Sequence, residues 1–554
     1  MRNLTELAER GADRYGTRPA FRELGPDRAV HEYSYRSLHD DVVAAGTALL
    51  DQGLAGGHVA MVGEASYAYV VCYLAVVCTG GVIVPLDKEL TDAELADLIV
   101  RCDADAVLYG DELHADIAGI LAHCPRVRLT VNISRYAPES HRPGFDALLA
   151  RGRQLLAAGD TRFAEVSIDP DAPAAILFTS GTTGPSKGVM LSQRNIVTVI
   201  HSAFSLFRFP RVCLSVLPIN HAYEFNLNVL GCLFDGITLC FNDSIMHVRE
   251  NLGRFRPEMS LMVPMIVEAL YKNIWKEAEK NHMTGYLKYA VALSNGLRTI
   301  GIDLRRVFFR PILEHFGGRL RVIVCGGAPL GPDVVAGLTS FGITVYNGYG
   351  ITECAPLISS NCTVRSVPGS VGVPVPDLEV RIGEPDADGT GEIQVRGPAV
   401  MLGYYRDPVA TNQAFTEDGW FRTGDLGHLG KRGALFITGR QKNLIILPNG
   451  KNVQPEEIEE ALLGGIAYLR EVVVHELVDQ TGAPRIAASA YLDPDWVGGV
   501  GFEGARARFE ADVAAVNQRL AAYKRVCLTN LREQEFEKTS TRKIMRHRVE
   551  GALA

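Results

Sequence analysis

The sequence predicts an α/β protein built on parallel β-sheets, and two observations support that prediction. Helical patterns alternate with short β-branched runs, which is typical of βαβ units. The 554 residues also exceed the size of one compact domain, so we expect a large body and at least one smaller unit. An apolar fraction of 47% supplies enough side chains for a sizeable core and argues against long disorder.

The elements of the first half follow from these patterns in chain order. Residues 67–86 are almost wholly uncharged and long enough to span a bilayer as one helix, but Gly80 and Gly81 interrupt them. We therefore favour a buried helix ending near Cys78 and a strand at 82–84 over a membrane span. The elements predicted next are a helix over 91–102, strands at 106–108 and 128–131, and an apolar run at 174–178.

The composition changes after about residue 360. Glycine and proline then punctuate short strands such as 392–395, which predicts a smaller β-rich subdomain. Next come a helix beginning near Pro455, a strand at 471–474 and a helix over 502–523. These elements predict a compact α+β domain at the end of the chain. We therefore expect two domains, 1–440 and 441–554.

Charge and cysteine content limit the function classes. A formal net charge of −8 gives no basic footprint, so we expect no nucleic-acid partner. The eleven cysteines are scattered, odd in number and contain no Cys-x-x-Cys pair, which disfavours zinc and disulfides and indicates reduced thiols. Residues 1–10 are charged and amphipathic, unlike a signal peptide. These features predict a cytoplasmic protein with no transmembrane span.

The segment 179–188, Thr-Ser-Gly-Thr-Thr-Gly-Pro-Ser-Lys-Gly, is the most informative motif. Its glycines let backbone N–H groups turn toward an anion, its hydroxyls add donors, and Lys187 adds a point charge for a polyphosphate. The common P-loop needs a hydroxyl directly after the lysine, whereas Gly188 follows Lys187 here. We predict a loop that holds a nucleoside triphosphate; a plain glycine- and serine-rich surface loop is the alternative.

Three further polar clusters extend this prediction. Tyr349 lies between two glycines, where it can stack on a purine, and Glu353 can hold a hard divalent cation through oxygen. A Gly-Tyr-Gly turn with a solvated glutamate is the alternative. Asp425 lies beside a turn and is suited to accept hydrogen bonds from two ribose hydroxyls. Arg440 and Lys442 place two cations at the predicted domain boundary, where charge is as often solvated as functional.

In combination these motifs resemble the adenylate-forming superfamily, which includes acyl-CoA synthetases, luciferases and the adenylation domains of peptide synthetases. The segments that carry the resemblance are 179–188, 217–221, 349–353, 419–425, 439–442 and 538–544. Segments 217–225, 316–330 and 447–459 are most similar to bacterial long-chain fatty acyl-CoA synthetases. The resemblance implies a large N-terminal domain of two α/β subdomains and a small β-rich subdomain, followed by a small mobile α+β domain.

The resemblance also implies which residues bind ATP. They are Thr179, Ser180, Gly181, Thr182, Thr183, Lys187, Gly326, Gly327, Ala328, Asn347, Gly348, Tyr349, Gly350, Thr352, Asp425, Ile437, Arg440 and Lys543. Within this set Asp425 is implied to grip the ribose and Arg440 to support ribose and phosphate. Lys543 is implied to reach both the substrate carboxylate and the α-phosphate.

The catalytic and acyl-binding residues are implied in the same way. Glu353 is implied to bind Mg²⁺, and with Thr352, His221 and Lys543 it forms the implied catalytic set. His221, Tyr223 and Phe225 are implied to lie at the acyl pocket, with His221 as an aromatic gate. A structural histidine is the alternative for His221, because a lone histidine beside apolar residues is more often structural.

The implied reaction has two halves. An apolar carboxylic acid attacks the α-phosphorus of ATP, giving an acyl-adenylate and pyrophosphate, and the acyl group then passes to the thiol of coenzyme A. Because Lys543 would obstruct the thiol, the resemblance implies rotation of the C-terminal domain about a hinge at Lys442. Three alternatives remain: an acyl-AMP ligase that loads a carrier-protein phosphopantetheine, an ATP-binding regulatory protein, and a phosphate-hydrolysing NTPase. Loose membrane association is compatible with a substrate that partitions into lipid.

Overall fold

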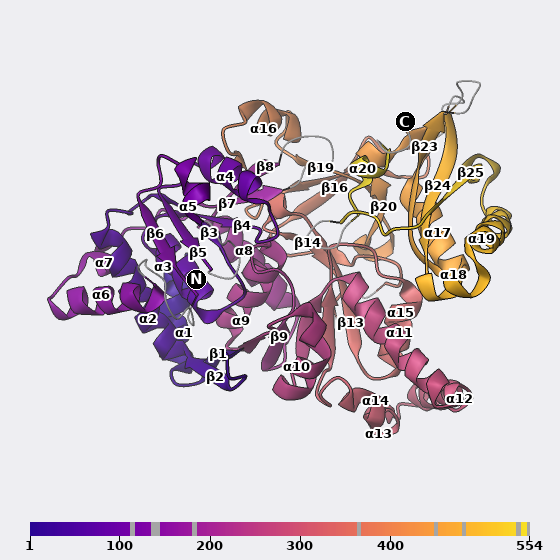
Figure 1. Cartoon of the computed structure of the whole chain (residues 1–554), viewed down its shortest axis with the longest axis horizontal. Helices are drawn as coiled ribbons and strands as arrows, with labels where there is room; N and C mark the ends of the chain where they lie inside the picture. The colour runs from indigo at the N-terminus through magenta and orange to yellow at the C-terminus, as the bar shows by residue number, and fades with distance from the viewer. Residues whose placement is uncertain are drawn as a thin grey trace. The chain divides into compact units, whose positions relative to one another are not determined.

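The computed structural model divides into two compact units by the contacts between residues (Figure 1). Unit 1 contains the described residues up to Glu379 together with Arg396–Thr416, and unit 2 contains Val380–Val395 together with the described residues from Glu417 onward. The described residues are 1–110, 117–134, 144–179, 186–362, 367–447, 452–478, 484–538 and 544–550. Unit 2 joins the predicted β-rich subdomain to the C-terminal residues, and the boundary between 1–440 and 441–554 stays a prediction.

Unit 1 contains two large sheets, in agreement with the predicted α/β class. The seven-stranded sheet has the order β18 (Gly403–Tyr404), β8 (Lys187–Ser192), β7 (Pro173–Thr179), β4 (Val82–Leu86), β3 (His58–Val62), β5 (Ala106–Tyr109) and β6 (Leu129–Asn132). The nine-stranded sheet has the order β15 (Val373–Pro374), β14 (Leu357–Ser360), β13 (Thr344–Gly350), β12 (Val322–Cys325), β11 (Met259–Met262), β9 (Val212–Ser215), β10 (Thr238–Phe241), β1 (Pro19–Leu24) and β2 (Val30–Ser34). Strands from β7 to β6 in the first sheet, and from β13 to β1 in the second, pair in parallel.

Helices connect these strands, as a parallel sheet requires. Those of the first part of unit 1 are α1 (Leu4–Tyr15), α2 (Tyr35–Asp51), α3 (Tyr67–Cys78), α4 (Asp92–Arg101), α5 (Ile117–Ala122), α6 (Phe145–Ala157), α7 (Arg162–Glu165), α8 (Gln193–Leu206), α9 (Leu230–Asp235) and α10 (Val248–Phe255). The others are α11 (Pro264–Lys280), α12 (Thr284–Thr299), α13 (Arg305–Phe308), α14 (Arg310–Glu314), α15 (Pro332–Ser340) and α16 (Pro408–Ala414). A π-helix, η1 (Tyr223–Val229), and short 3-10 turns at η2 (Ile245–His247) and η3 (Thr352–Cys354) complete the unit.

The uncharged stretch at 67–86 is a helix followed by a strand, as predicted. Ser66 caps α3 by accepting a hydrogen bond from the backbone of Tyr69, and all twelve side chains of α3 are buried. The helix ends where the Thr79 hydroxyl donates to backbone carbonyls of the last turn and Gly80 takes a positive φ of 76°. Among the described helices, none combines the length and apolar character needed to cross a bilayer.

Unit 2 contains a small antiparallel sheet and an α+β part. The four-stranded sheet has the order β16 (Glu379–Gly383), β17 (Gly391–Arg396), β19 (Phe421–Leu429) and β20 (Leu435–Arg440), with a 3-10 turn η4 (Lys431–Gly433). The α+β part comprises η5 (Gln441–Asn443), β21 (Ile445–Ile446), β22 (Asn452–Val453), α17 (Pro455–Gly465), β23 (Leu469–Val478), β24 (Pro484–Leu492), α18 (Pro494–Val500), α19 (Phe502–Asn517), η6 (Ala522–Lys524), β25 (Leu528–Arg532) and α20 (Arg546–Glu550). Its core lies between the β23–β24–β25 sheet and helices α17 and α19.

The predicted helix over 502–523 is wrong beyond Asn517. The Asn517 side chain accepts a hydrogen bond from the backbone N–H of Val526 at 2.9 Å and donates to its carbonyl at 2.9 Å. This pair of bonds holds the returning chain against the end of α19, so the residues between turn toward β25 and do not extend the helix. Apolar periodicity alone did not reveal the turn.

Candidate functional site

The predicted phosphate loop joins two neighbouring strands of unit 1. The apolar run at 174–178 lies in β7, and Lys187 opens β8, which pairs antiparallel with it so that Thr179 faces Lys187. The Thr179 hydroxyl donates to the Lys187 carbonyl at 3.4 Å. A side chain at Gly188 would come within 2.8 Å of Ile176, so this strand pair needs a glycine there. The predicted ligands Ser180, Gly181, Thr182 and Thr183 lie outside the described residues.

Lys187 and Glu353 both contact the same tyrosine. The Lys187 ammonium nitrogen lies 4.7 Å from the centre of the Tyr404 ring, and the Tyr404 hydroxyl donates to Glu353 Oε1 at 3.0 Å. Burial, and then the nearby Glu353 carboxylate, raise the pKa of Tyr404, so its hydroxyl stays a donor. The pairing of β18 with β8 brings Tyr404 to this position. Sequence reasoning missed Tyr404 because no local pattern encodes that pairing.

The backbone around Glu353 is tightly folded. A Cβ at Gly350 would lie 1.8 Å from the Pro356 carbonyl oxygen, so only glycine fits at the end of β13. Thr352 and Glu353 then form the short turn η3, and the Glu353 carbonyl accepts from the Met401 backbone at 2.8 Å. The site therefore holds Glu353 through both its side chain and its backbone.

The carboxylate of Glu353 is a suitable ligand for a magnesium ion whose other ligands come mainly from a bound substrate. No group of three or more His, Cys, Asp or Glu side chains suited to a metal occurs in the part of the chain that the structure describes. Mg²⁺ retains several waters and typically takes one or two carboxylates together with substrate phosphates. The Glu353 carboxylate, which is oriented by the Tyr404 hydroxyl and lies near Lys187, fits that requirement.

The segments predicted to bind adenine lie at the carboxyl ends of parallel strands. Gly326, Gly327 and Ala328 directly follow β12, and Asn347 to Gly350 form the last part of the neighbouring strand β13. Ligands of open α/β sheets bind at this edge. The Asn347 side-chain oxygen is buried and has no hydrogen-bond partner among the described residues, as expected of a group that awaits a ligand. Tyr349 is itself largely buried.

The predicted acyl-pocket residues lie in and beside the π-helix η1. Tyr223 donates to the Val324 carbonyl at 3.0 Å, and its ring would lie 3.4 Å from a Cβ at Gly326. Phe225 is buried and stacks on Tyr73 with ring centres 3.8 Å apart. His221 is half-buried, and its carbonyl accepts from the Phe225 backbone at 2.8 Å. π-Helical turns are rare in proteins, and many of those that occur lie at functional sites.

A buried carboxylate in η1 has no counterpart in the sequence prediction. Ser215 and Asn228 donate to Glu224 Oε1, whereas Oε2 is buried without a partner among the described residues. Burial raises the pKa of Glu224 to about 7, although these hydrogen bonds oppose the shift. The π-helix that carries Tyr223 and Phe225 therefore also contains a buried carboxyl group whose pKa is raised toward neutrality.

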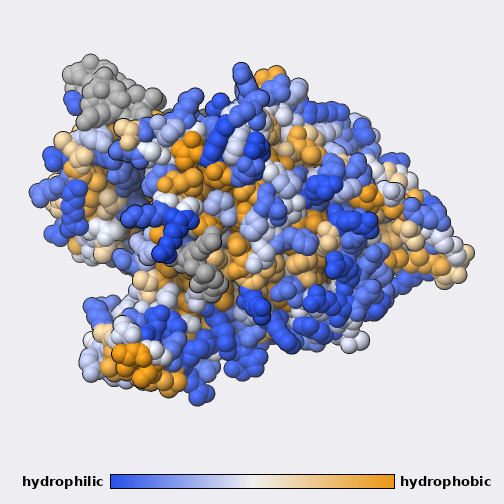
Figure 2. Space-filling model, turned by 180° about the vertical axis from the view of Figure 1, so that it is seen from behind, coloured by the Kyte–Doolittle hydropathy of each residue, from blue (hydrophilic) through white to orange (hydrophobic). Residues whose placement is uncertain are grey.

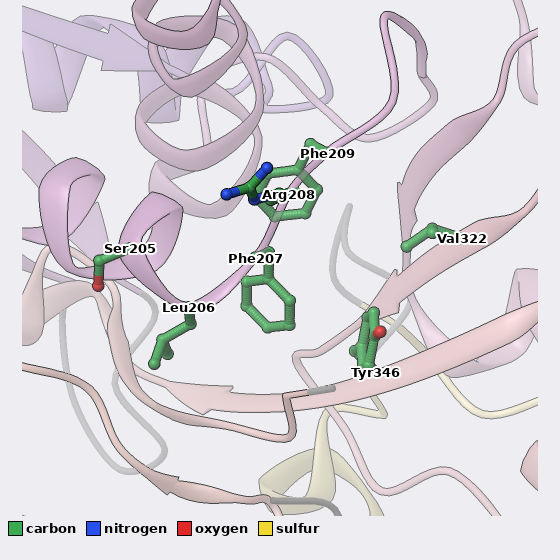
Figure 3. A pocket seen from close by; sticks show the side chains of 7 residues that line it. All are labelled: Ser205, Leu206, Phe207, Arg208, Phe209, Val322 and Tyr346. Atoms are coloured by element: carbon green, nitrogen blue, oxygen red, sulfur yellow. The ribbon is translucent and has the colours of Figure 1, made fainter. Parts of the chain in front are cut away.

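A cavity of about 410 Å³ lies against the nine-stranded sheet (Figure 3). Its lining residues are Ser205, Leu206, Phe207, Arg208, Phe209, Val322 and Tyr346. The Phe207 and Tyr346 rings contact each other at a tilt of 51°, with centres 4.9 Å apart. Tyr346 and Gly348 are alternate residues of β13 and so belong to one face of the strand. The cavity therefore lies on the face of β13 that also carries Gly348, a residue predicted to line the acyl and adenine sites.

Unit 2 brings Asp425 and Arg440 together. They face each other across the β19–β20 pair, and Arg440 Nε donates to Asp425 Oδ1 at 2.8 Å. Asp425 exposes only 6% of its side chain, whereas Arg440 exposes 46%. The guanidinium thus anchors a buried carboxylate, and Ile437 is exposed on the same strand β20.

Of the two lysines predicted to act in the C-terminal part, the structure describes only Lys442. Lys442 is exposed in the turn η5, next to Asn443, whose side chain donates to Glu456 of α17 at 2.6 Å. An exposed residue at the end of one element is a suitable hinge position. Lys543 lies outside the described residues, and its neighbour Ile544 forms an isolated bridge with Lys538.

Known proteins share both the sequence pattern and the fold. The profile of the family described as AMP-binding enzyme matches residues 8–405. The chain is 30% identical over 514 residues to the long-chain-fatty-acid–CoA ligase FadD15 of Mycobacterium bovis, covering 87% of this chain and 82% of that protein. It is 27% identical over 561 residues to the long-chain-fatty-acid–[acyl-carrier-protein] ligase AEE15 of Arabidopsis thaliana, covering 87% and 76%. The crystal structure of ATP-bound MatB from Rhodopseudomonas palustris matches with a TM-score of 0.77 at 25% identity, over 99% of both chains.

Proposed function

The chain belongs to the AMP-binding enzyme family, and on that premise we propose that it is an AMP-forming acid:coenzyme A ligase. It activates an apolar carboxylic acid with ATP, releasing pyrophosphate, and then transfers the acyl group to coenzyme A, releasing AMP. The contact of Lys187 and Glu353 with the same tyrosine is the observation that carries the proposal. It supplies a cation and a restrained carboxylate together, as the handling of a polyphosphate requires.

Charge is the main barrier in the first half-reaction. A carboxylate oxygen must attack the α-phosphorus, an anionic centre, while negative charge develops on the departing pyrophosphate. Lys187 would offset charge on the β- and γ-phosphates, and the contact of its ammonium group with the Tyr404 ring supports this role. Glu353 would hold Mg²⁺, which supplies further positive charge for the same phosphates. The Tyr404 hydroxyl orients that carboxylate.

The residues for the nucleoside part of ATP are assigned by resemblance. Asp425 would accept hydrogen bonds from the ribose hydroxyls, and its hydrogen bond from Arg440 orients the carboxylate. The unpartnered side-chain oxygen of Asn347 is suited to accept from the amino group of adenine. Lys543 would hold the substrate carboxylate and the α-phosphate together during attack.

The second half-reaction needs a different arrangement. The coenzyme A thiol attacks the acyl carbon of the adenylate, the bond to the AMP oxygen breaks, and the thiol proton is released. A lysine on the adenylate would obstruct that thiol, so we place the hinge that withdraws Lys543 at Lys442. Its exposed position in η5, directly after β20, supports this assignment.

We infer that the substrate is an acid with a long apolar chain. The cavity of about 410 Å³ lies on the face of β13 that also carries Gly348, with aromatic side chains around it. Such a chain would extend from the site near Tyr223 toward Phe207 and Tyr346. The similarity to a long-chain-fatty-acid–CoA ligase supports the same class.

The physiological acceptor and compartment are further parts of the proposal. Coenzyme A is favoured by the similarity to FadD15, and a carrier-protein phosphopantetheine is the second candidate because AEE15 is named for that acceptor. A cytoplasmic location is supported by the eleven cysteines, which are all free thiols.

A panel of carboxylic acids of increasing chain length tests the proposal. AMP release is measured for each acid with coenzyme A, with a phosphopantetheinylated carrier protein, and with neither. We expect AMP release to depend on the acid, to favour long apolar chains and to be fastest with coenzyme A. Release of ADP would exclude the adenylation chemistry, and stimulation by the carrier protein alone would favour the second acceptor.

A further inference from the structure

The turn between α4 and β5, residues 101–105, lies against the end of the predicted phosphate loop. Arg101, the last residue of α4, donates a hydrogen bond from Nη2 to the Ser186 carbonyl at 2.5 Å. Its guanidinium carbon lies 5.3 Å from the centre of the Phe178 ring in β7. Because Ser186 directly precedes Lys187, Arg101 restrains the backbone beside the lysine proposed to hold the phosphates.

The same turn also holds the segment that carries Tyr404. Asp103 Oδ2 accepts a hydrogen bond from the Tyr405 hydroxyl at 2.6 Å and pairs with Arg406 Nη2 at 2.7 Å. The backbone N–H of Tyr405 in turn donates to the Gly188 carbonyl at 2.7 Å. The chain is thus attached to this turn on both sides of the loop lysine and directly after Tyr404.

Asp103 is well suited to its place in the turn. It adopts a left-handed backbone conformation with a φ of 54°, which aspartate tolerates better than most residues. Its side chain exposes only 17% of its surface, and Arg126 lies 4.0 Å away as a second cation beside Arg406. Burial, and then the hydrogen bond to Asp103, raise the pKa of Tyr405 to about 12, so the Tyr405 hydroxyl stays a donor.

A purely structural role is the alternative for these contacts. Hydrophilic side chains cover much of the face shown in Figure 2, and an exposed ion pair on such a surface adds little to stability by itself. Helix α4 is also held without them, because its apolar side chains share a core cluster with Ile176 of β7. The contacts of Arg101 and Asp103 are distinguished by their targets, each of which lies one or two residues from Lys187 or Tyr404.

We propose that Arg101 and Asp103 are positioning residues for the phosphate site. Arg101 restrains the backbone beside Lys187. Asp103 holds the segment that carries Tyr404, and so acts on Glu353 through the Tyr404 hydroxyl. The inference rests on the proposed function, which assigns the polyphosphate to Lys187 and Glu353. Displacing such groups by about 1 Å can cost about 100-fold, so a loosened turn should weaken ATP binding and leave the acid site unchanged.

Calorimetric titration with MgATP tests the proposal on the full-length protein. Arg101→Met keeps the alkyl stem near Phe178 but removes the donor to the Ser186 carbonyl. Asp103→Gly removes the carboxylate and remains compatible with the positive φ. We expect each variant to raise the dissociation constant for MgATP by about tenfold, with the KM for the acid within about twofold of the wild type.

Double variants separate positioning from a general effect on the fold. If Asp103 acts through Tyr404, then Asp103→Gly should raise the dissociation constant by less than about twofold in a Tyr404→Leu background. Arg101→Met should behave in the same way in a Lys187→Ala background. Undiminished effects in both backgrounds would show that the turn does not act through these residues and would overturn the proposal.

A matched ion pair near the start of β7 provides the control. Arg194→Met and Asp171→Asn break that pair and should leave the affinity for MgATP unchanged. Denaturant unfolding measures the stability of every variant, and Asp103→Asn, which keeps an acceptor for Tyr405, should weaken MgATP binding less than Asp103→Gly does. Lost stability with wild-type affinity for MgATP would overturn the inference alone. Wild-type protein that binds no MgATP would overturn the proposed function and this inference with it.

Discussion

Tyr404 donates a hydrogen bond to Glu353 while its ring contacts the Lys187 ammonium group. One side chain thus orients the carboxylate proposed to hold Mg²⁺ and the cation proposed to hold the phosphates. The arrangement depends on the short strand β18, which pairs with β8 and delivers a tyrosine from a distant part of the sequence. The two functions of Tyr404 can be separated, because its hydroxyl and its ring make different contacts.

Tyr404→Phe should weaken the use of Mg²⁺ without changing the contact to Lys187. Loss of a side chain that orients a metal ligand costs about 10- to 100-fold in metal affinity. We therefore expect the Mg²⁺ concentration needed for half-maximal ATP–pyrophosphate exchange to rise by about tenfold or more. Tyr404→Leu, which also removes the aromatic ring, should in addition raise the KM for ATP. An unchanged Mg²⁺ requirement in Tyr404→Phe would show that the hydroxyl does not orient Glu353.

The stability of the protein should depend on pH through Glu224. The raised pKa of Glu224, about 7 against an ordinary 4.5, means that its proton is held more tightly in the folded state. Below pH 4.5 Glu224 does not lower the free energy of unfolding, because it is protonated in both the folded and the unfolded state. As the pH rises from 4.5 to 7 the unfolded state loses the proton first, so folding stability falls by up to about 3 kcal/mol and then levels off.

Glu224→Gln should remove that slope. The new amide brings one buried donor without a ready partner, so the absolute stability of the variant is less informative than its pH dependence. Denaturant unfolding at pH 5 and pH 8 measures it, with Glu6→Gln as a control carboxylate on the surface. If wild type and Glu224→Gln lose the same stability between these pH values, Glu224 is not the responsible group.

Asp425→Asn should raise the KM for ATP with little change in affinity for the acid. The substitution keeps the shape and the contact distance to Arg440 but removes the negative charge that strengthens hydrogen bonds to the ribose hydroxyls. Hydrogen bonds to charged groups contribute about 1.5–3 kcal/mol, which corresponds to about 10- to 100-fold. Exchange kinetics with 2′-deoxy-ATP provide the control. Because this analogue lacks one ribose hydroxyl, its KM should differ less between the wild type and Asp425→Asn than the KM for ATP does. An equal effect with both nucleotides would remove Asp425 from the ribose.

Lys442→Pro should separate the two half-reactions. Proline fixes φ near −65°, so it restricts rotation at a hinge without removing any group that touches ATP. We expect acid-dependent exchange to persist and acyl-CoA formation to be lost, whereas Lys442→Ala should retain both. Equal loss of both half-reactions in the proline variant would show that Lys442 is not the hinge.

The sequence predicted elements whose signals are local. The helix α3 and the strand β4 follow from an uncharged run divided by Gly80 and Gly81, and the parallel sheets follow from the alternation of elements. The end of α19 was missed because it depends on the hydrogen bonds between Asn517 and Val526. Periodicity carries no information about such a bond between a helix end and the next strand.

The candidate site shows the same division. Asp425 and Arg440 were each predicted from their motifs, but only the register of β19 against β20 makes them partners. Tyr404 and Glu224 were not predicted, since one depends on pairing between distant strands and the other on burial within a π-helix. The roles of Ser180, Gly181, Thr182, Thr183 and Lys543 rest on the sequence alone.

Incorporation of labelled pyrophosphate into ATP, in the absence of coenzyme A, tests adenylate formation most directly. A reversible acyl-adenylate requires that the label enter ATP only when a carboxylic acid and Mg²⁺ are both present. We expect this exchange with long apolar acids in the wild type and its loss in Lys543→Ala. Exchange without any acid, or undiminished exchange in Lys543→Ala, would contradict adenylate formation at the proposed site.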